Sequence, residues 1–423
     1  MKAVMRALMA GSLGLTLIGC TASGDESMAA TPASPVPEAA AAMADIAVRP
    51  LAGTDAAPFD RARSMRAPAG WSVTVWARVP GARLLAWTPD QRLLVSRPKL
   101  GDVVELIPGA ADAAPQQHTL VSGLNQPHGL AFRGDTLYVA ESDQVDTFAY
   151  SAGAVTGKKV VIDGLPDAKS PELGGAYAHA LKSVAIGGDG TIYVSVGSTG
   201  NISTEDRAAT PERATILKAP PGGGTPTVFA RGVRNGTGLA IAPDGAVWTA
   251  VNNRDNIADP ADHKVKQSYV NDHPLEPLAK LTQGRDLGWP YCNPALDRSW
   301  DRDDQLNRDG QKLDCAALPE IEQGMGAHSA PLGLSFATLP APFGAGALVG
   351  IHGSWNRKPP RAPEVSFFAW SKGDLGPQRT LLGGFQDAEG NRWGRPVMAV
   401  QGPDQAIYVS DDLAGAIYRV SPS

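Results

Sequence analysis

The chain has 423 residues, among them 47 glycines and 35 prolines, and a formal net charge of −5. This small net charge, with only 19% charged residues, argues against nucleic acid as the main partner. Three cysteines are sparse for this length. The length allows two or three domains, although all-β folds often run this long as one domain.

The N-terminus has the pattern of a bacterial export signal. Residues 1–6 are short and basic, and residues 7–19 are apolar but too few to span a membrane as a helix. The stretch ends in Leu17-Ile18-Gly19-Cys20, which resembles a lipobox, in which the cysteine becomes the lipidated first residue. An ordinary signal peptide with a chance cysteine is the alternative. We expect a signal peptide at 1–19 and a lipoprotein of the cell envelope that faces the periplasm. Only the lipid on Cys20 would anchor it, and outer-membrane attachment is favoured because no Asp follows.

The next segment is expected to be a tether. From residue 21 to about residue 48 the chain is mostly Ala, Pro, Ser and Met, with few large apolar side chains. Such a composition cannot bury a core and predicts disorder. We therefore expect a flexible linker at 20–66 and one folded domain at 67–423.

From about residue 71 onward one unit recurs, in which an apolar tetrad is followed by a turn, an alternating strand, a polar loop and another strand. Copies begin at residues 84, 129, 183, 238, 333 and 397. A repeat of roughly 40–50 residues made only of strands is typical of β-propeller blades, and no helical periodicity is sustained. The pattern predicts an all-β, six-bladed β-propeller. Residues 71–76 are expected to complete the last blade beside residues 416–420, which would close the ring.

The widest gap between copies predicts a long insertion at about 256–324. It contains Cys292 and Cys315, which we expect to form a disulfide in an oxidising compartment. Two buried free thiols are the alternative, and two cysteines alone do not make a zinc site. The acidic run at 301–304 lacks the spacing of a calcium-binding loop and is expected to be a solvated surface.

Polar residues should meet where the blade loops converge. His179 precedes a predicted hairpin with a Gly-rich turn, and Gly197–Asn201 follows it. Four histidines fall at such loops, namely His128, His179, His328 and His352. A lone loop histidine is more often structural, but four at one face favour a general base among them. Three arginines lie beside Gly, Pro or Asn at blade mouths, namely Arg234, Arg357 and Arg395. Together they favour a small polyanionic ligand, and surface arginines are the alternative.

Several of these motifs occur together in one known family. The motifs are Gln126-Pro127-His128-Gly129, His179 with Gly197–Asn201, Arg234-Asn235, Gly288-Trp289-Pro290-Tyr291-Cys292, His328–Gly333, His352–Arg357, and Gly394-Arg395-Pro396 with Ser410–Asp412. In this combination, over about 67–420, the sequence resembles the soluble glucose/sorbosone dehydrogenases. These are six-bladed quinoproteins that use pyrroloquinoline quinone (PQQ). The match is closer to the sorbosone dehydrogenase branch.

The resemblance implies roles for individual residues. His179 would be the base that takes the proton from a sugar hydroxyl, and Arg234 and Asn235 would lie beside the quinone oxygens. Arg395 would bind a cofactor carboxylate, and Arg357, with His128 and His352, would also contact PQQ. Family members hold calcium against the quinone, but the calcium ligands in this chain stay open. Ser198 replaces an Asp of the glucose branch, so the sugar also stays open.

The expected function is therefore PQQ-dependent oxidation of an aldose, or of a sugar aldehyde or alcohol, to its lactone or acid. The enzyme would be a sugar dehydrogenase, an oxidoreductase that passes electrons to a quinone or cytochrome. Two alternatives remain. One is a non-enzymatic propeller that binds glycan or protein. The other is a calcium-dependent lactonase, for which the nearby carboxylates are Glu141, Asp143, Asp255 and Asp411.

Overall fold

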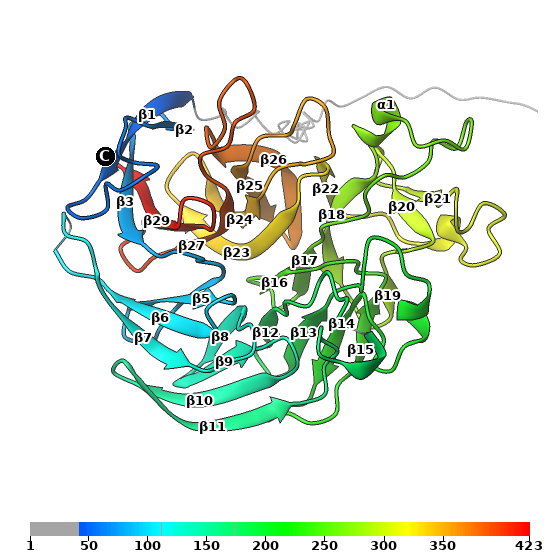
Figure 1. Ribbon diagram of the computed structural model, residues 1–423, viewed down its shortest axis with the longest axis horizontal. Helices are drawn as coiled ribbons and strands as arrows, with labels where there is room; N and C mark the ends of the chain where they lie inside the picture. The colour runs from blue at the N-terminus through cyan, green and yellow to red at the C-terminus, as the bar shows by residue number, and fades with distance from the viewer. Residues whose placement is uncertain (1–41, 111, 174) are drawn as a thin grey trace, which may run out of the picture. The chain divides into compact units, whose positions relative to one another are not determined.

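The computed structural model describes residues 42–423 except 111 and 174. The expected signal peptide, Cys20 and most of the expected tether lie outside the described residues. Six sheets of four or more strands form the ring of blades predicted from the sequence (Figure 1). The six-bladed propeller prediction is therefore confirmed.

The first three blades follow the chain in order. Blade 1 contains β4 (Leu85–Trp87), β5 (Leu93–Arg97), β6 (Asp102–Ile107) and β7 (Gln116–Ser122). Blade 2 contains β8 (Gly129–Arg133), β9 (Thr136–Ala140), β10 (Val145–Ser151) and β11 (Ala154–Ile162). Blade 3 contains β12 (Val184–Ile186), β13 (Ile192–Val196), β14 (Thr215–Ala219) and β15 (Thr227–Arg231), to which the short β19 (Arg285–Asp286) adds.

The remaining blades include one strand from the start of the domain. Blade 4 contains β16 (Gly238–Ile241), β17 (Val247–Ala250), β18 (Leu275–Leu281) and β22 (Gln323–Ala327). Blade 5 contains β23 (Pro331–Leu339), β24 (Gly344–Ile351), β25 (Glu364–Ser371) and β26 (Asp374–Leu382). Blade 6 contains β27 (Pro396–Gln401), β28 (Ile407–Asp411), β29 (Ala416–Pro422) and β3 (Trp71–Arg78). β3 pairs with β29, so the predicted ring closure is confirmed.

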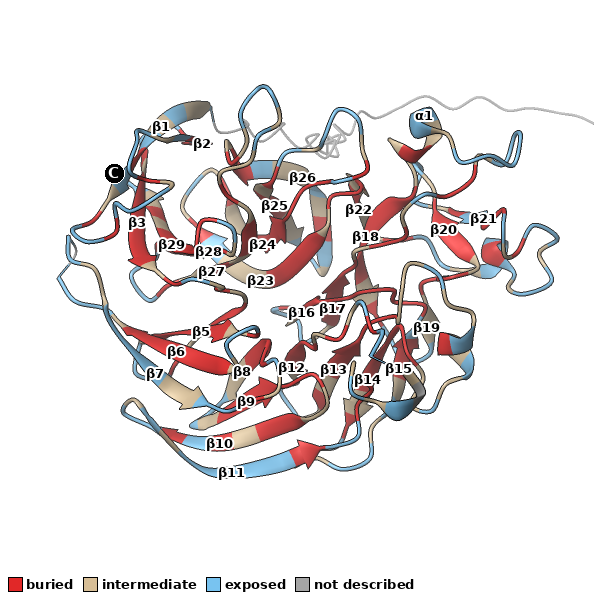
Figure 2. Cartoon of the chain, viewed as in Figure 1, coloured by how far each residue is buried: buried red, intermediate tan, exposed pale blue. Residues whose placement is uncertain are grey.

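The inner strands pack against one another around the axis, in the order β4, β8, β12, β16, β23, β27 and back to β4. They approach so closely that a Cβ on Gly129 would lie 2.5 Å from the backbone nitrogen of Val184, which explains a glycine at the start of the tetrad. Apolar side chains leave a space of only about 20 Å³ between these strands. The second and third strands are buried, whereas the outer β7 and β11 are largely exposed (Figure 2).

The folded part begins earlier than the sequence predicts. The linker was expected to reach residue 66, but β1 (Met43–Pro50) and β2 (Ser64–Pro68) extend the sheet of blade 6. β1 pairs in parallel with β3, and Val48 is buried. The expectation of disorder was therefore wrong from residue 43. β1 is paired on both sides, with β2 and with β3, so backbone hydrogen bonds stabilise it although it has few large apolar side chains.

The expected insertion at 256–324 is not one continuous loop. β18 and β22 lie within it and form the third and fourth strands of blade 4. Pro277 sits inside β18, which obscures the strand pattern in the sequence. Two excursions remain. One carries α1 (Gln267–Val270), and the other carries the β20 (Cys292–Pro294)–β21 (Trp300–Arg302) hairpin and the 3₁₀ turn η3 (Cys315–Ala317). The 3₁₀ turns η1 (Pro171–Leu173) and η2 (Glu205–Ala208) lie elsewhere, in blade 3 loops.

The predicted disulfide is confirmed, since Cys292 and Cys315 are bonded. We predict that replacing both cysteines by serine lowers the free energy of unfolding by about 3 kcal/mol, since the bond closes a loop of 23 residues' separation. Chemical denaturation with and without reductant checks this. Reductant should destabilise the wild type and leave the double variant unchanged. Equal stability of wild type and variant under oxidising conditions would contradict it.

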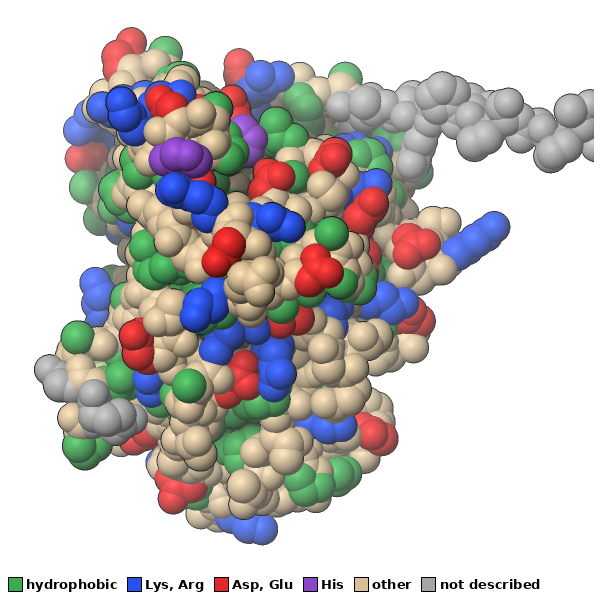
Figure 3. Space-filling model, turned by 90° about the vertical axis from the view of Figure 1, so that its right-hand side faces the viewer, with side chains coloured by type: hydrophobic (Ala, Val, Ile, Leu, Met, Phe, Trp, Pro, Cys, Tyr) green, Lys and Arg blue, Asp and Glu red, His purple; other side chains and the backbone are tan. Residues whose placement is uncertain are grey.

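Within residues 42–423, apart from 111 and 174, no helix is long and apolar enough to cross a membrane. Acidic and basic side chains are interspersed on the side of the molecule that faces the viewer in Figure 3. That side therefore shows no broad surface of a single charge.

Candidate functional site

A polar cavity lies where the loops of blades 3, 4 and 5 meet. Its volume is about 150 Å³, or about 430 Å³ with its open mouth. The lining residues are His179, Arg234, Asn252, Asp255, Glu276, His328, Ala330, Gly353, Ser354, Trp355 and Asn356. They lie just before the inner strands β12, β16 and β23, just after the second strands β17 and β24, or at the start of β18. The repeat thus brings distant segments to one end of the blades.

His179 lies in this cavity as a neutral imidazole. Its Nδ1 lies 3.0 Å from the carbonyl oxygen and 2.9 Å from Oγ of Ser198. Ser198 Oγ in turn donates to the Gly200 carbonyl, at 2.7 Å. Because both Ser198 atoms then act as acceptors, we assign the ring proton to Nδ1 and the lone pair to Nε2. Burial, with the nearby Arg234, lowers the pKa of His179 to about 3.

The position of His179 depends on a glycine in the following strand end. A Cβ on Gly197 would lie 2.5 Å from the Cβ and 2.7 Å from the carbonyl oxygen of His179. Tyr177 also donates to the Gly197 carbonyl at 2.7 Å. The Gly197–Asn201 loop can therefore support the imidazole only while residue 197 has no side chain.

We predict that Gly197→Ala displaces His179 and lowers kcat by about 10²-fold, since a shift of about 1 Å in a reacting group has effects of this size. Gly188→Ala is the matched control. Gly188 is in the same hairpin, and a Cβ there would meet nothing within 4 Å. Steady-state kinetics of the two variants check the prediction. Equal kcat values for both would contradict it.

Arg234 is buried on the cavity wall and is held by backbone and amide oxygens. Its Nη1 donates to the Asn252 carbonyl at 3.1 Å, and its Nη2 donates to Oδ1 of Asn201 at 3.0 Å. The Asp255 carboxylate lies 3.7 Å from the same Nη2. Burial lowers the pKa of Arg234 to about 10, so the side chain remains a cation at neutral pH.

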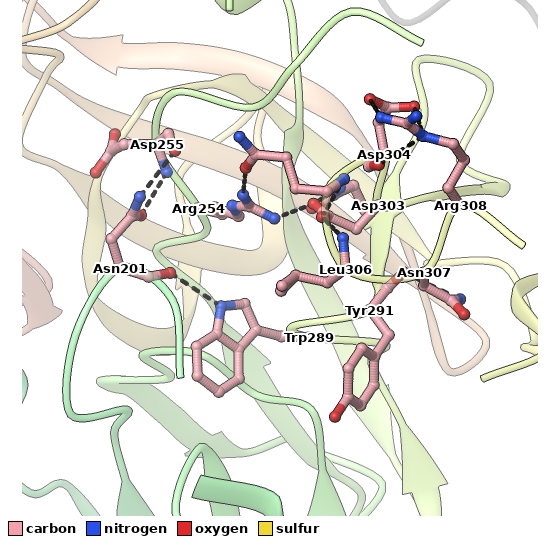
Figure 4. A network of polar contacts seen from close by, with 12 residues as sticks. Asn201, Arg254, Asp255, Trp289, Tyr291, Asp303, Asp304, Leu306, Asn307 and Arg308 are labelled. Carbon is pink, nitrogen blue, oxygen red and sulfur yellow. Dashed lines mark hydrogen bonds and ion pairs between the residues drawn. The ribbon is translucent and has the colours of Figure 1, made fainter. Parts of the chain in front are cut away.

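Asn201 joins the loop of His179 to the other side of the cavity (Figure 4). Its amide pairs with the backbone of Asp255 in both directions, with Oδ1 accepting at 2.8 Å and Nδ2 donating at 2.9 Å. Trp289 Nε1 donates to the Asn201 carbonyl at 3.3 Å. Asn201 thus fixes Asp255 and Arg234 relative to the segment that carries Ser198.

A buried ion pair supports the same wall from behind. Arg254 bonds to Asp303 and Gln305 of the second excursion, and Asn293 Nδ2 donates to Asp303 at 2.9 Å (Figure 4). Asp303 is 2% exposed, so the expectation of a solvated face at 301–304 was wrong for this residue. Its partner is 49 residues away in sequence, which explains why the acidic run alone gave no sign of it.

His328 and Ala330 form the opposite wall in a strained backbone. Both are non-glycine residues with positive φ, +55° and +53°. His328 Nε2 donates to the carbonyls of Val270 and His273, at 2.6 and 3.1 Å, and its Nδ1 lies 3.3 Å from Asp255. Backbone strain of this kind concentrates at functional sites, which agrees with the placement of the cavity.

A second polar cluster contains His352 and Arg395. His352 Nε2 lies 2.9 Å from Asp412, and Arg395 Nη2 contacts His352 Nδ1. Arg83 binds the other oxygen of Asp412 at 2.8 Å. Burial lowers the pKa of His352 to about 4. The cluster is next to the cavity, because Gly353 and Ser354, which directly follow His352 in the chain, line the cavity wall.

The structure therefore brings together only some of the predicted site residues. His179 and Arg234 share the cavity, and the carbonyl of Asn235 accepts from Asn252 at 3.0 Å beside it. His128 is fully buried, with Nδ1 at 3.1 Å from the Lys182 carbonyl, and it does not line the cavity. Burial lowers the pKa of His128 well below its usual value.

The position of Arg357, and several residues in and around the cavity, differ from what the sequence predicts. Arg357 does not line the cavity, and its Nη2 lies 3.6 Å from Asp272. Asn201 was predicted only as part of the Gly197–Asn201 loop, and Asn252 and Glu276 were given no role in the site. Glu276 did leave a signal, as the single charge in the apolar run Leu275–Leu278.

A larger hollow of about 390 Å³ lies elsewhere, lined by residues that include Trp76, Trp87 and Tyr408. It adjoins the β4–β5 and β27–β28 turns, at the opposite ends of the blades from His179. Its charged groups, Asp404 and Arg419, already pair at 2.8 Å. The smaller cavity is therefore the better candidate for chemistry.

Similar solved structures share this architecture. The holo form of the pyranose dehydrogenase PQQ domain from Coprinopsis cinerea has a TM-score of 0.71 and 20% identity, covering 84% of this chain and 97% of that chain. The calcium structure of the Trichoderma reesei carbohydrate-active enzymes family AA12 has a TM-score of 0.70 and 19% identity, covering 84% of this chain and 96% of that chain. The apo form of the soluble aldose sugar dehydrogenase from Escherichia coli has a TM-score of 0.56 and 14% identity, covering 84% of this chain and 100% of that chain. At these identities the likeness concerns the fold alone.

Sequence comparison identifies a relative of this chain and the family to which it belongs. An uncharacterized protein of Borreliella burgdorferi is 22% identical over 320 residues, which cover 72% of this chain and 77% of the relative. The family described as TrAA12-like matches residues 65–423, which include the whole propeller except β1. The chain belongs to the TrAA12-like family.

Proposed function

We propose that this protein is a PQQ-dependent sugar dehydrogenase that oxidises an aldose, or a sugar aldehyde or alcohol, to its lactone or acid. The observation that carries the proposal is the pairing of a neutral, buried His179 with a buried Arg234 in one cavity. A base and a fixed cation at one site suit removal of the proton from a hydroxyl group and of the hydride from the carbon that bears it. Structural neighbours described as a PQQ domain and as an aldose sugar dehydrogenase support it.

The residues around the cavity fit PQQ, which is a planar quinone with three carboxylates. Trp355 stands at the rim with 73% of its surface exposed, so an indole face is available for a flat ring. Both amide atoms of Asn356 are buried without a hydrogen-bond partner among the described residues. In the adjacent cluster Arg395 Nε is likewise unpaired, which suits a carboxylate. Arg234, Asn356, Trp355 and Arg395 would therefore hold the cofactor.

When bound, PQQ supplies the two-electron acceptor that takes the hydride. His179 would accept the hydroxyl proton at Nε2 while Ser198 fixes the ring through Nδ1. Arg234 would place its positive charge where negative charge develops. Because its guanidinium is already held by Asn201 and Asn252, little reorganisation is needed during the reaction.

Calcium remains a proposal without assigned ligands. Among the residues that the structure describes, no group of three or more His, Cys, Asp or Glu side chains is arranged to hold a metal. The carbonyl of Asn252, a residue of the cavity lining, accepts a hydrogen bond from Arg234. Among the structural neighbours, a calcium structure of the Trichoderma reesei family supports testing this ion.

We also keep three finer proposals. The protein would belong to the sorbosone-type branch, and it would pass electrons to a quinone or cytochrome. It would be anchored by lipid on Cys20 to the periplasmic side of the envelope, at the outer membrane. Each of these rests on the sequence patterns described above.

The experiment is reconstitution of the purified protein with PQQ, with and without calcium, followed by dye reduction on a panel of sugars. We expect dye reduction with at least one aldose, and only after PQQ has been added. Absence of both retained quinone absorbance and dye reduction would contradict the proposal. Sugar binding without PQQ uptake would instead indicate a non-enzymatic glycan-binding propeller.

A further inference from the structure

One acidic side chain of the cavity has no role in the scheme above. Glu276 is the second residue of β18 and is 2% exposed, yet it lines the cavity. Its Oε2 is buried and has no hydrogen-bond partner among the described residues. A buried oxygen without a partner is costly unless a ligand satisfies it.

The surroundings of Glu276 disfavour its charged form. Burial is the largest effect, and the like charge of Asp255 adds to it. A backbone hydrogen bond from Ala330 and the cations Arg234 and Arg361 act in the opposite direction. The balance raises the pKa of Glu276 to about 8. His179 and His328 also face the cavity, and His179 adds no positive charge at neutral pH.

A protonated carboxyl differs chemically from Arg234 and His179 on the same wall. It can donate through its O–H and accept through its carbonyl oxygen, whereas an ionised carboxylate only accepts. Arg234 can only donate, and His179 Nε2 only accepts. Sugar hydroxyls need both kinds of partner, and a protonated Glu276 can be either.

We propose that Glu276 binds the substrate as a carboxylic acid, donating a hydrogen bond from Oε2 to a hydroxyl or ring oxygen of the sugar beside His179. This inference rests on the proposed function and specifies how the polyhydroxylated substrate is recognised. The proton stays on Glu276 throughout, and no bond to it forms or breaks.

The first test detects the protonated carboxyl group of Glu276 directly and does not depend on enzymatic turnover. Infrared difference spectra of the purified protein without cofactor, titrated from pH 6 to pH 10, should show the carbonyl stretch of a protonated carboxylic acid. That band should disappear around pH 8 in the wild type and be absent from Glu276→Gln. A wild-type spectrum identical to that of Glu276→Gln at pH 6 would overturn the proposal.

The second test separates binding from chemistry with the PQQ-loaded protein. Glu276→Ala should raise the KM for the sugar about tenfold, the loss of one hydrogen bond, with kcat and the Kd for PQQ changed much less. Glu276→Gln keeps a donor and should raise KM only about threefold at pH 7. The wild-type KM should rise above pH 8, whereas that of Glu276→Gln should not.

Glu322→Gln is the matched control. Glu322 lies in the same blade, pairs with Arg285 at 2.5 Å and is not on the cavity wall. Thermal unfolding of all variants checks that they fold. An active wild type with an unchanged KM in Glu276→Ala would overturn this inference and leave the proposed function intact. A wild type that neither oxidises the sugar panel nor binds it by calorimetry would overturn both.

Discussion

Replacing His179 by alanine is expected to lower kcat by about 10²–10⁴-fold, the usual contribution of a positioned general base. The reason is geometric as well as chemical. Ser198 engages Nδ1 at 3.0 and 2.9 Å, so Nε2 carries the basic lone pair in the cavity. His328, the other histidine among the described residues that line the cavity, uses Nε2 to donate to two backbone carbonyls, and its Nδ1 faces Asp255. Stopped-flow measurement of sugar oxidation by the PQQ-loaded variant gives the effect.

Two controls make this result interpretable. His118→Ala removes a half-exposed imidazole from β7, far from the cavity residues in sequence, and should leave kcat unchanged. Binding of PQQ to His179→Ala should remain within a few-fold of wild type, since this residue acts on the substrate. Full turnover in His179→Ala would remove the base assignment.

The lowered pKa of His179 also predicts how stability depends on pH. The folded value is about 3 and the ordinary value is 6.5, so the unfolded chain takes up the proton first as pH falls. The free energy of unfolding should therefore decrease between about pH 6.5 and pH 3. His179→Gln should weaken that decrease in denaturation experiments. Because His179 stays neutral well below pH 6.5, its protonation should not cause activity to fall with a midpoint near pH 6.5.

Arg234→Lys is expected to lower kcat by about 10²–10³-fold, as for loss of a preorganised donor of transition-state charge. Lysine keeps the charge but lacks the planar fork, so it cannot engage both Asn201 and the Asn252 carbonyl. Stability should change less than activity, because the smaller cation can still face Asp255.

Arg234→Met removes the positive charge of Arg234 and keeps a long side chain at this position. Burial is the main cause of the lowered pKa of His179 and Arg234 adds to it, so removing Arg234 should raise that pKa and move the acidic loss of activity to higher pH. Arg231→Lys is the control, since Arg231 pairs with Glu212 on the exposed side of the same segment. A pH profile of Arg234→Met parallel to that of the wild type would contradict the electrostatic coupling.

The ring of blades followed from the sequence because each blade repeats a local pattern. Tetrads such as Gly129–Phe132 and Gly238–Ile241 alternate with turns that contain Asp and Gly, and this periodicity needs no knowledge of distant contacts. β1 escaped detection because backbone pairing with both β2 and β3 stabilises it, although it has few large apolar side chains. β18 escaped because Pro277 interrupts its pattern, although its register with β17 is regular.

The site was predictable only in part. His179 and Arg234 stand beside glycine-rich segments at strand ends, which is a local signal. The wall around Asp255 and Glu276 depends on contacts such as that between Asn201 and Asp255, which are 54 positions apart, so no local pattern reveals it. Arg395 and His352 were grouped with His179 because all three fall in loops expected to converge on one face, and the structure places Arg395 and His352 together in the adjoining cluster.

In the proposed reaction, a neutral imidazole and a fixed guanidinium of one cavity act together in oxidation of a sugar by bound PQQ. A single-turnover absorbance measurement tests it most directly, with PQQ-loaded wild-type protein mixed with sugar in the absence of any external acceptor. The account predicts one reduced cofactor per protein in the wild type and a rate at least about 100-fold lower in His179→Ala. Bound PQQ that stays oxidised with every sugar, or that is reduced equally fast in both proteins, would contradict it.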